Sequence, residues 1–273
     1  MLSSFRALHA RAACTPVGAL AFCVLAGCLL ASCATAHFTP DRQSGFVERD
    51  TAGHRHFVYL PADWTPDKSW PVILFLHGAG ERGSDGVAPT QVGLGPPAWK
   101  SHGKLPFIIV FPQCRPGIYW PMREMRDRAI AALEDAVVTY HGDPTRIYVT
   151  GNSMGGYGTW ALGAQYPERF AALVPIAGGV RPPFGKLPAD PIFKEGEDPE
   201  LTIARAVGRT PVWIFHGRRD WMVSPDNSRR MFARLKEVGG DVRYNELSDV
   251  GHQAEDPAYA MPELFDWLLA QHR

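Results

Sequence analysis

A glycine-flanked serine at residues 151–155 constrains the fold of this chain more than any other feature. These residues read Gly-Asn-Ser-Met-Gly, which is a G-x-S-x-G pattern. An apolar, β-branched run at residues 146–150 precedes it, and apolar residues at helical spacing follow from Tyr157 onward. A strand, a tight turn and a helix are therefore predicted, with Ser153 on a strained elbow above a parallel sheet. The flanking glycines are expected because a Cβ at either position would crowd the neighbouring strand and helix.

The rest of the chain alternates between predicted strands and predicted helices. Continuous apolar runs such as residues 71–76 and 106–112 are typical of strands buried on both faces of a parallel sheet. The alternation predicts an α/β fold with a mostly parallel central sheet flanked by helices. The other predicted strands are residues 45–49, 55–60, 171–176, 211–215 and 241–247. The other predicted helices are residues 98–102, 126–140, 226–238 and 262–269.

Residues 181–207 differ from this alternation. Prolines interrupt the segment from Pro182 to Pro199, and acidic residues lie between them. Proline breaks both helices and ladders, so we predict a short Pro-rich excursion near the active site rather than a core element.

The first 33 residues are predicted to be a leader rather than part of the fold. Arg6 and Arg11 precede an apolar stretch at residues 16–31 that is too short for a spanning helix. Residues 30–33 read Leu-Ala-Ser-Cys and resemble the bacterial lipoprotein box, so Cys33 is the expected lipidation site. Cys28 ends a similar pattern, and plain cleavage before His37 is a further alternative. We expect a protein of the cell envelope, as a periplasmic or outer-membrane lipoprotein, or a secreted one.

We expect residues 34–44 to be a tether and residues 45–273 to form one catalytic domain. The composition is 45% apolar and 21% charged with a net charge of zero, so no nucleic-acid partner is indicated. His54 and His56 share a strand face without a third candidate ligand nearby, so a surface strand is predicted there rather than a metal site. Cys114 is the one cysteine of the domain and is predicted to be a small buried residue. The sequence does not indicate an oligomeric state.

An elbow serine needs a base and a carboxylate that orients the base. In this fold class the chain order is serine, acid, histidine. Asp220 follows the predicted strand at 211–215, and His252 lies in a loop after the last strand. Two other acids are less suitable. Asp226 is better placed to start the following helix, and Asp249 lies too close to His252 in sequence.

The predicted oxyanion donors are backbone N–H groups. One belongs to Met154, directly after the nucleophile, and the other to Ala79, in the loop after the strand at 71–76. His77, at the start of that loop, is expected to support the loop rather than to act as a base.

Four sequence blocks now carry a family resemblance, at residues 77–83, 151–160, 216–220 and 251–252. They resemble the phospholipase/carboxylesterase and polyhydroxybutyrate-depolymerase-like esterases of the α/β-hydrolase superfamily, which include feruloyl-esterase-like proteins and "predicted peptidases". The resemblance spans residues 46–269. It implies the α/β-hydrolase fold and the roles given above. Asn152 and Trp221 depart from the usual pattern and can reshape the pocket.

The expected function is that of an exported serine esterase that hydrolyses a small-molecule carboxylic ester through an acyl-enzyme, without a cofactor. Small-acyl or aromatic esters are expected, because Trp120 and Trp221 lie on loops at the carboxyl ends of strands and suit a planar group. Membrane contact is expected only through the N-terminal lipid. The alternatives are a serine peptidase of the same fold and a non-catalytic binding protein on a hydrolase scaffold.

Overall fold

The computed structural model describes residues 39–42, 45–100, 105–181, 192–194 and 196–273. These residues belong to one compact unit, His37–Arg273. The predicted leader with Cys33, most of the predicted tether and the middle of the Pro-rich excursion lie outside the described residues.

The unit is built on one eight-stranded sheet with the order β1-β2-β4-β3-β5-β6-β7-β8. The two strands β1 and β2 form an antiparallel hairpin, and β2 pairs antiparallel with β4. Every other neighbouring pair is parallel, which confirms the predicted α/β class. The strands are β1 (Phe46–Thr51), β2 (His54–Tyr59), β3 (Trp70–Leu76), β4 (Ile108–Phe111), β5 (Gly142–Asn152), β6 (Ala172–Ile176), β7 (Val212–Gly217) and β8 (Val242–Leu247).

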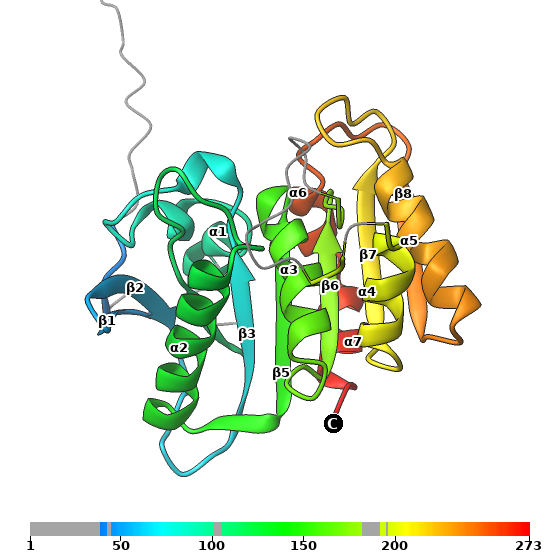
Figure 1. Cartoon of the computed structure of the whole chain (residues 1–273). Helices are drawn as coiled ribbons and strands as arrows, with labels where there is room; N and C mark the ends of the chain where they lie inside the picture. Colours follow the sequence, from blue (N-terminus) through cyan, green and yellow to red (C-terminus); the bar gives the residue numbers. More distant parts are fainter. Residues whose placement is uncertain (1–38, 43–44, 101–104, 182–191, 195) are drawn as a thin grey trace, which may run out of the picture. The chain divides into compact units, whose positions relative to one another are not determined.

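Helices cover both faces of the sheet (Figure 1). Side chains alternate along β3, so Val72 and Leu74 join one apolar core while Ile73 and Phe75 join the other. The first core is completed by α2 (Arg123–Thr139), α3 (Met154–Gln165), α4 (Pro199–Val207) and α5 (Asp226–Glu237). The second is completed by α1 (Gly95–Lys100), α6 (Glu255–Tyr259) and α7 (Pro262–Leu269).

The helix α4 corrects the prediction for residues 181–207. The carboxylate of Asp198 accepts a hydrogen bond from the Leu201 N–H at 3.0 Å and so caps the helix, and Pro199 occupies its first turn. Proline suits this position because the first N–H groups of a helix have no intrahelical partner. Ile203 and Val207 are buried in the core, so the end of the predicted excursion is a core element.

Two smaller expectations can also be compared with the structure. Cys114 is fully buried, as predicted. His56 is buried too, although the hairpin was expected to be a surface strand, and burial lowers its pKa. In the part of the chain that the structure describes, no group of three or more His, Cys, Asp or Glu side chains could hold a metal ion.

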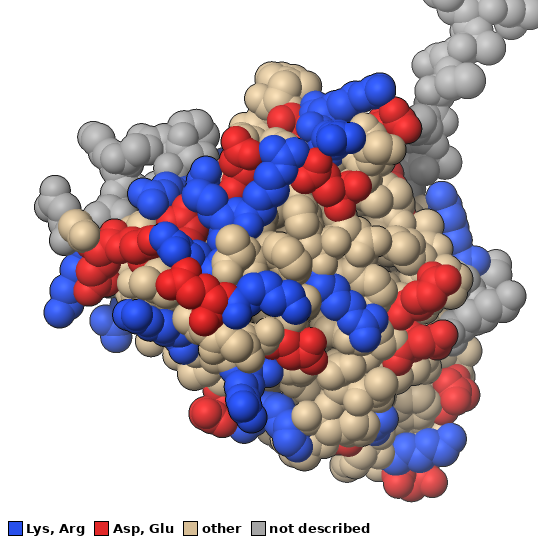
Figure 2. All heavy atoms as spheres, turned by 90° about the vertical axis from the view of Figure 1, so that its right-hand side faces the viewer, with Lys and Arg blue, Asp and Glu red and all other residues tan. Residues whose placement is uncertain are grey.

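Charged side chains of both signs are interleaved on the face that Figure 2 shows. Ion pairs among the described residues include those of Glu246, which contacts Arg229 at 2.7 Å and Arg218 at 3.4 Å. Neither sign forms a continuous patch there. None of the helices among the described residues combines the length and the apolar character needed to cross a membrane.

Candidate active site

Ser153 lies on a sharp turn between β5 and α3. Its backbone has φ 55° and ψ −117°, a conformation that costs free energy for any residue with a side chain. The turn is tight because the surroundings are close: a Cβ on Gly151 or on Gly155 would overlap the carbonyl oxygen of Leu76 in β3. The predicted strand, elbow and helix are thus present, and the two glycines have the steric role expected of them.

His252 lies between Ser153 and Asp220. Its Nε2 is 2.8 Å from the Ser153 Oγ, and its Nδ1 is 2.7 Å from the Asp220 Oδ2. Since a carboxylate only accepts, Nδ1 carries the proton and donates to Asp220, which leaves Nε2 to accept from the serine hydroxyl. The structure therefore brings together the three residues that the sequence placed in three separate loops.

Two neighbouring loops bring Asp220 and His252 together. The strand β7 runs parallel to β8, and the Arg219 N–H donates to the Val250 carbonyl at 2.9 Å. A Cβ on Gly217 would overlap the carbonyl oxygen of Gly251, so the end of β7 lies directly against the loop that carries His252. Parallel neighbours end at the same edge of a sheet, and these backbone contacts fix the distance between the two loops.

The Asp220 carboxylate is held from both sides. Its Oδ1 accepts hydrogen bonds from the Met222 and Val223 N–H groups, each at 2.9 Å. Burial by itself would raise the pKa of Asp220, but hydrogen bonds from His216, His252 and Val223 outweigh it and hold that pKa well below its usual range. Asp220 is therefore ionised whenever the protein is folded near neutral pH.

His216, at the end of β7, is a contact of Asp220 that the sequence reasoning did not identify. Its Nε2 lies 2.9 Å from the Val223 carbonyl and 3.3 Å from the Asp220 Oδ2, while its Nδ1 lies 2.6 Å from the Ser228 Oγ. Both His216 and Ser228 are buried. Because the Val223 carbonyl can only accept, Nε2 carries a proton. This N–H points toward the Val223 carbonyl oxygen and the Asp220 Oδ2. The only signal in the sequence was the position of His216 at the start of the block that ends in Asp220.

The two rival acids lie elsewhere. Asp226 is in the first turn of α5 and pairs with Arg229 at 2.7 Å, as expected of a residue that starts a helix. Asp249 pairs with Arg219 at 2.8 Å on the surface. Neither forms one of the hydrogen bonds described for His252.

The loop after β3 places Ala79 beside Ser153, where both line one pocket. Met154 is the first residue of α3, so its N–H is among the helix-terminal groups without an intrahelical acceptor. His77 supports the loop: its Nδ1 donates to the Gly78 carbonyl at 2.6 Å, and its Nε2 accepts from the Cys114 N–H at 2.9 Å. Burial lowers the pKa of His77 to about 4, so the ring is neutral.

The two tryptophans predicted to bind substrate lie in very different environments. Trp120 is 1% exposed, and its Nε1 donates to the His77 carbonyl at 2.9 Å. It packs beneath the loop that carries Ala79 and does not line the Ser153 pocket, so the prediction of a direct substrate contact does not fit its position. Trp221 is 85% exposed and precedes Met222, which does line that pocket. Its role in substrate binding stays a prediction.

The Ser153 pocket has a volume of about 620 Å³, including space open to solvent. Phe75 and Met222 contribute apolar surface to it. Its polar lining includes Asn152 and two carboxyl groups, those of Glu81 and Glu255. The sequence did not indicate either glutamate, because nothing in the local pattern shows that these two residues line the same pocket.

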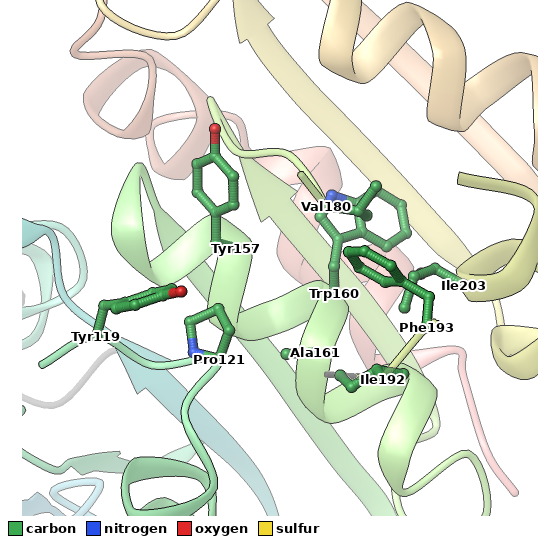
Figure 3. Close-up of a pocket in the computed structure, with 9 residues that line it drawn as sticks. All are labelled: Tyr119, Pro121, Tyr157, Trp160, Ala161, Val180, Ile192, Phe193 and Ile203. Atoms are coloured by element: carbon green, nitrogen blue, oxygen red, sulfur yellow. The ribbon is translucent and has the colours of Figure 1, made fainter. Parts of the chain in front are cut away.

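A second pocket lies along α3 and has a volume of about 400 Å³, including space open to solvent. Figure 3 shows aromatic side chains from α3 and from the loop after β4 around it. Trp160 is buried there, and its Nε1 has no hydrogen-bond partner among the described residues. The pocket is lined by Tyr119, Pro121, Tyr157, Trp160, Ala161, Val180, Ile192, Phe193 and Ile203.

Comparison with known proteins relates the chain to esterases and peptidases. Residues 120–197 match the prolyl oligopeptidase family. Poly(3-hydroxyalkanoate) depolymerase C of Paucimonas lemoignei is 26% identical over 66% of this chain and 47% of its own length. Feruloyl esterase B of Neurospora crassa is 25% identical over 73% of this chain and 75% of its own length. An uncharacterized secreted protein of Arthroderma benhamiae is 29% identical over 67% of this chain and 21% of its own length.

Solved structures of esterases and peptidases are similar to this chain as well. A thermostable esterase superposes with a TM-score of 0.67 at 30% identity, over 85% of this chain and 64% of its own. An acylaminoacyl peptidase of Pyrococcus horikoshii superposes with a TM-score of 0.62 at 17% identity, over 84% of this chain and 42% of its own, and shows the shared fold alone. The chain thus spans about half the length of the depolymerase and somewhat less than two thirds of the thermostable esterase. By its sheet, its serine elbow and these similarities, the chain has the α/β-hydrolase fold, which it shares with esterases and peptidases.

Proposed function

We propose that this protein is an exported serine esterase that hydrolyses small-acyl or aromatic carboxylic esters through an acyl-enzyme. The observation that carries the proposal is the position of His252, whose two ring nitrogens contact the Ser153 hydroxyl and the Asp220 carboxylate at 2.8 and 2.7 Å. A histidine so oriented can take a proton from the serine on one side while the carboxylate stabilises the imidazolium that forms.

In the proposed reaction, His252 removes the proton of Ser153 as Oγ attacks the ester carbonyl. The backbone N–H groups of Met154 and Ala79 donate hydrogen bonds to the oxyanion that develops. His252 then gives its proton to the leaving alkoxide, and an acyl-Ser153 ester remains. Water, deprotonated by His252, attacks this ester, and His252 returns the proton to the Ser153 Oγ as the acyl–Oγ bond breaks and the acid is released. These side chains and amides account for each proton transfer without a metal or an organic cofactor.

Labelling with a fluorophosphonate, followed by peptide mapping, tests the nucleophile. We expect the label on Ser153 in the wild-type protein and no label in Ser153→Ala, which should also lose ester hydrolysis. Ser69→Ala is the control, because Ser69 is exposed, directly precedes β3 and does not line the Ser153 pocket, so its label and activity should be unchanged. Label on another serine, or an unlabelled wild-type protein, would contradict the mechanism and favour a non-catalytic binding protein.

The preference for small or aromatic esters rests on the apolar surface of Phe75 and Met222 in the Ser153 pocket and on the exposed Trp221 beside it. Stacked rings favour planar groups. The name of the related feruloyl esterase points to the same class of acyl group. Comparison of kcat/KM for acetyl, butyryl, hydroxycinnamoyl and palmitoyl esters tests this preference. A palmitoyl ester as the best substrate would contradict it while leaving the triad assignment intact.

Serine peptidase activity is the second candidate, and the match of residues 120–197 to the prolyl oligopeptidase family favours it. A peptidase would have to protonate an amine leaving group and bind an extended backbone. A peptide amide of matched acyl group belongs in the same panel. If the kcat/KM of the amide exceeds that of the esters, the protein is a serine peptidase and the proposal of an esterase fails.

Export and anchoring through Cys33 remain part of the proposal. The lipoprotein-like residues 30–33 support it, and the related secreted protein of Arthroderma benhamiae is in keeping with export. A multiply acylated cysteine anchors a protein stably in a bilayer, whereas one acyl chain does so only marginally. Mass spectrometry of the mature N-terminus should find a lipid-modified Cys33. An unmodified terminus at His37 would reject lipidation and leave plain secretion.

A further inference from the structure

The Ser153 pocket has an acidic wall that ester hydrolysis as such does not require. Glu81 ends the short 3₁₀ helix η2 (Ala79–Glu81), and Glu255 is the first residue of α6. Both line the pocket together with Ser153 and His252, whereas none of the described lining residues is a lysine or arginine. Two acidic residues and no basic one therefore lie beside the place where the substrate would bind.

Two oxygen atoms of the lining residues have no hydrogen-bond donor in the described structure. One is the Oε2 of Glu255, and the other is the Oδ1 of Asn152. Asn152 is only 8% exposed, and it directly precedes Ser153. A buried acceptor without a donor lowers stability, and a ligand that supplies N–H or O–H groups removes that penalty. The unpaired oxygens thus indicate a ligand with hydrogen-bond donors.

Electrostatics points the same way. Burial raises the pKa of Glu255 to about 7, and the negative charges of Asp256 and Glu81 act in the same direction. Burial also raises the pKa of Glu81. The ionised forms of Glu81 and Glu255 are therefore disfavoured, and a positively charged or hydrogen-bond-donating group beside them would stabilise these forms. A carboxylate bound there would repel the ionised form of either glutamate and raise its pKa further, so its binding is disfavoured wherever these groups are ionised.

We propose that Glu81, Glu255 and Asn152 form a hydrogen-bond-accepting subsite, which binds a hydroxyl or ammonium group of the substrate and disfavours a carboxylate. The inference rests on the proposed esterase function and narrows its substrate class. The shared chemistry is an N–H or O–H donor a few bonds away from the ester. A polyol ester would supply hydroxyls, and an amino-alkyl ester would supply an ammonium.

The test compares esters that differ only in one terminal group. Butyrate esters of 1-butanol, 1,4-butanediol, 4-ammonio-1-butanol and 4-hydroxybutanoate carry a methyl, hydroxyl, ammonium and carboxylate terminus on the alcohol side. Ethyl esters of hexanoate bearing the same termini at carbon 6 place the group on the acyl side. Hydrolysis is followed by acid release at constant pH. We expect kcat/KM for the hydroxyl or the ammonium ester to exceed that for the alkyl ester about tenfold in one series, the order of one hydrogen bond to a charged group.

Glu255→Gln and Glu81→Gln should reduce this ratio toward one. Glu263→Gln is the matched control, since Glu263 also lies in the first turn of a helix but is exposed and outside the pocket. Loss of the ammonium preference alone in the variants identifies an amine-bearing substrate, and loss of the hydroxyl preference identifies a polyol.

Equal kcat/KM for the alkyl, hydroxyl and ammonium esters in both series would overturn the subsite but not the esterase function. A preference for the carboxylate ester would overturn it as well. If no ester is hydrolysed and Ser153 is not labelled, the proposed function itself fails, and the subsite with it. The wild-type comparison needs no variant, so misfolding of a variant cannot obscure the result.

Discussion

The Nε2 of His216 lies 3.3 Å from the Oδ2 of Asp220, so a second histidine faces the carboxylate that orients His252. On its other side, His216 contacts the Ser228 Oγ at 2.6 Å. This links the carboxylate to α5, which carries Ser228. His216 and Ser228 are positioning residues for Asp220, because neither touches Ser153 or the pocket that it lines.

Replacing His216 should lower kcat more than it changes KM. His216→Leu removes the donor to Asp220, and we expect kcat to fall about tenfold, the order of one hydrogen bond to a charged group. His216→Gln keeps an N–H donor and should recover part of the loss, which a purely structural role would not predict. Steady-state kinetics on a butyryl ester, with thermal unfolding to verify folding, measures this. An unchanged kcat in a folded His216→Leu protein would contradict the positioning role.

Asp220→Asn should leave the fold intact and lower kcat by roughly 10²–10⁴, because the imidazole of His252 loses the partner that fixes its tautomer. Asp226→Asn is the control, since Asp226 is the rival acid and pairs with Arg229 on the surface. We expect its kcat to stay within about twofold of the wild-type value. A large loss of kcat in Asp226→Asn with little loss in Asp220→Asn would show that Asp226, and not Asp220, is the triad acid.

Gly155→Ala should destabilise the protein by about 1–3 kcal/mol or more, because the new Cβ would overlap the Leu76 carbonyl and drive the elbow away from β3. Gly80→Ala is the matched control, since a Cβ there meets nothing within 4 Å. Urea unfolding of the two variants gives the comparison. Equal midpoints would mean that the elbow can move away from β3 at little cost.

Glu255 should make stability depend on pH. In the folded protein its pKa is raised to about 7 from the ordinary 4.5, so the folded state binds more protons between these values and becomes less stable as pH rises. This contribution is complete below about pH 4.5 and is lost as pH rises through about 7. Glu255→Gln resembles the protonated form at every pH.

The variant should therefore gain stability relative to the wild-type protein as the pH is raised from 5 to 8. Thermal unfolding across this range measures the difference, with Glu263→Gln as the exposed control. A difference that is constant with pH would show that Glu255 titrates normally in the folded protein.

The sequence by itself determined the elements that depend on contiguous residues. The apolar runs predicted the buried strands β3 and β4 because burial on both faces requires apolar side chains at every position. The serine elbow could be predicted for a similar reason, since Gly151 and Gly155 satisfy a steric requirement that is local to the turn. Pro199 was misinterpreted as a breaker, because a proline in the first turn of a helix looks the same in sequence as one in a loop.

Chain order also placed Ser153, Asp220 and His252 in the correct loops, since parallel strands end at one edge of the sheet. Their contacts, however, join residues 99 and 32 positions apart and depend on how β7 and β8 pair.

Only the tertiary structure decided where the side chains of the loops point. Trp120 lies at the predicted edge of the sheet, yet its indole turns inward because the His77 carbonyl accepts its N–H. Glu81 ends η2 and Glu255 begins α6, far apart in the sequence, and no local pattern shows that they line the same pocket. Such contacts follow from packing between distant elements, which is a property of the folded chain as a whole.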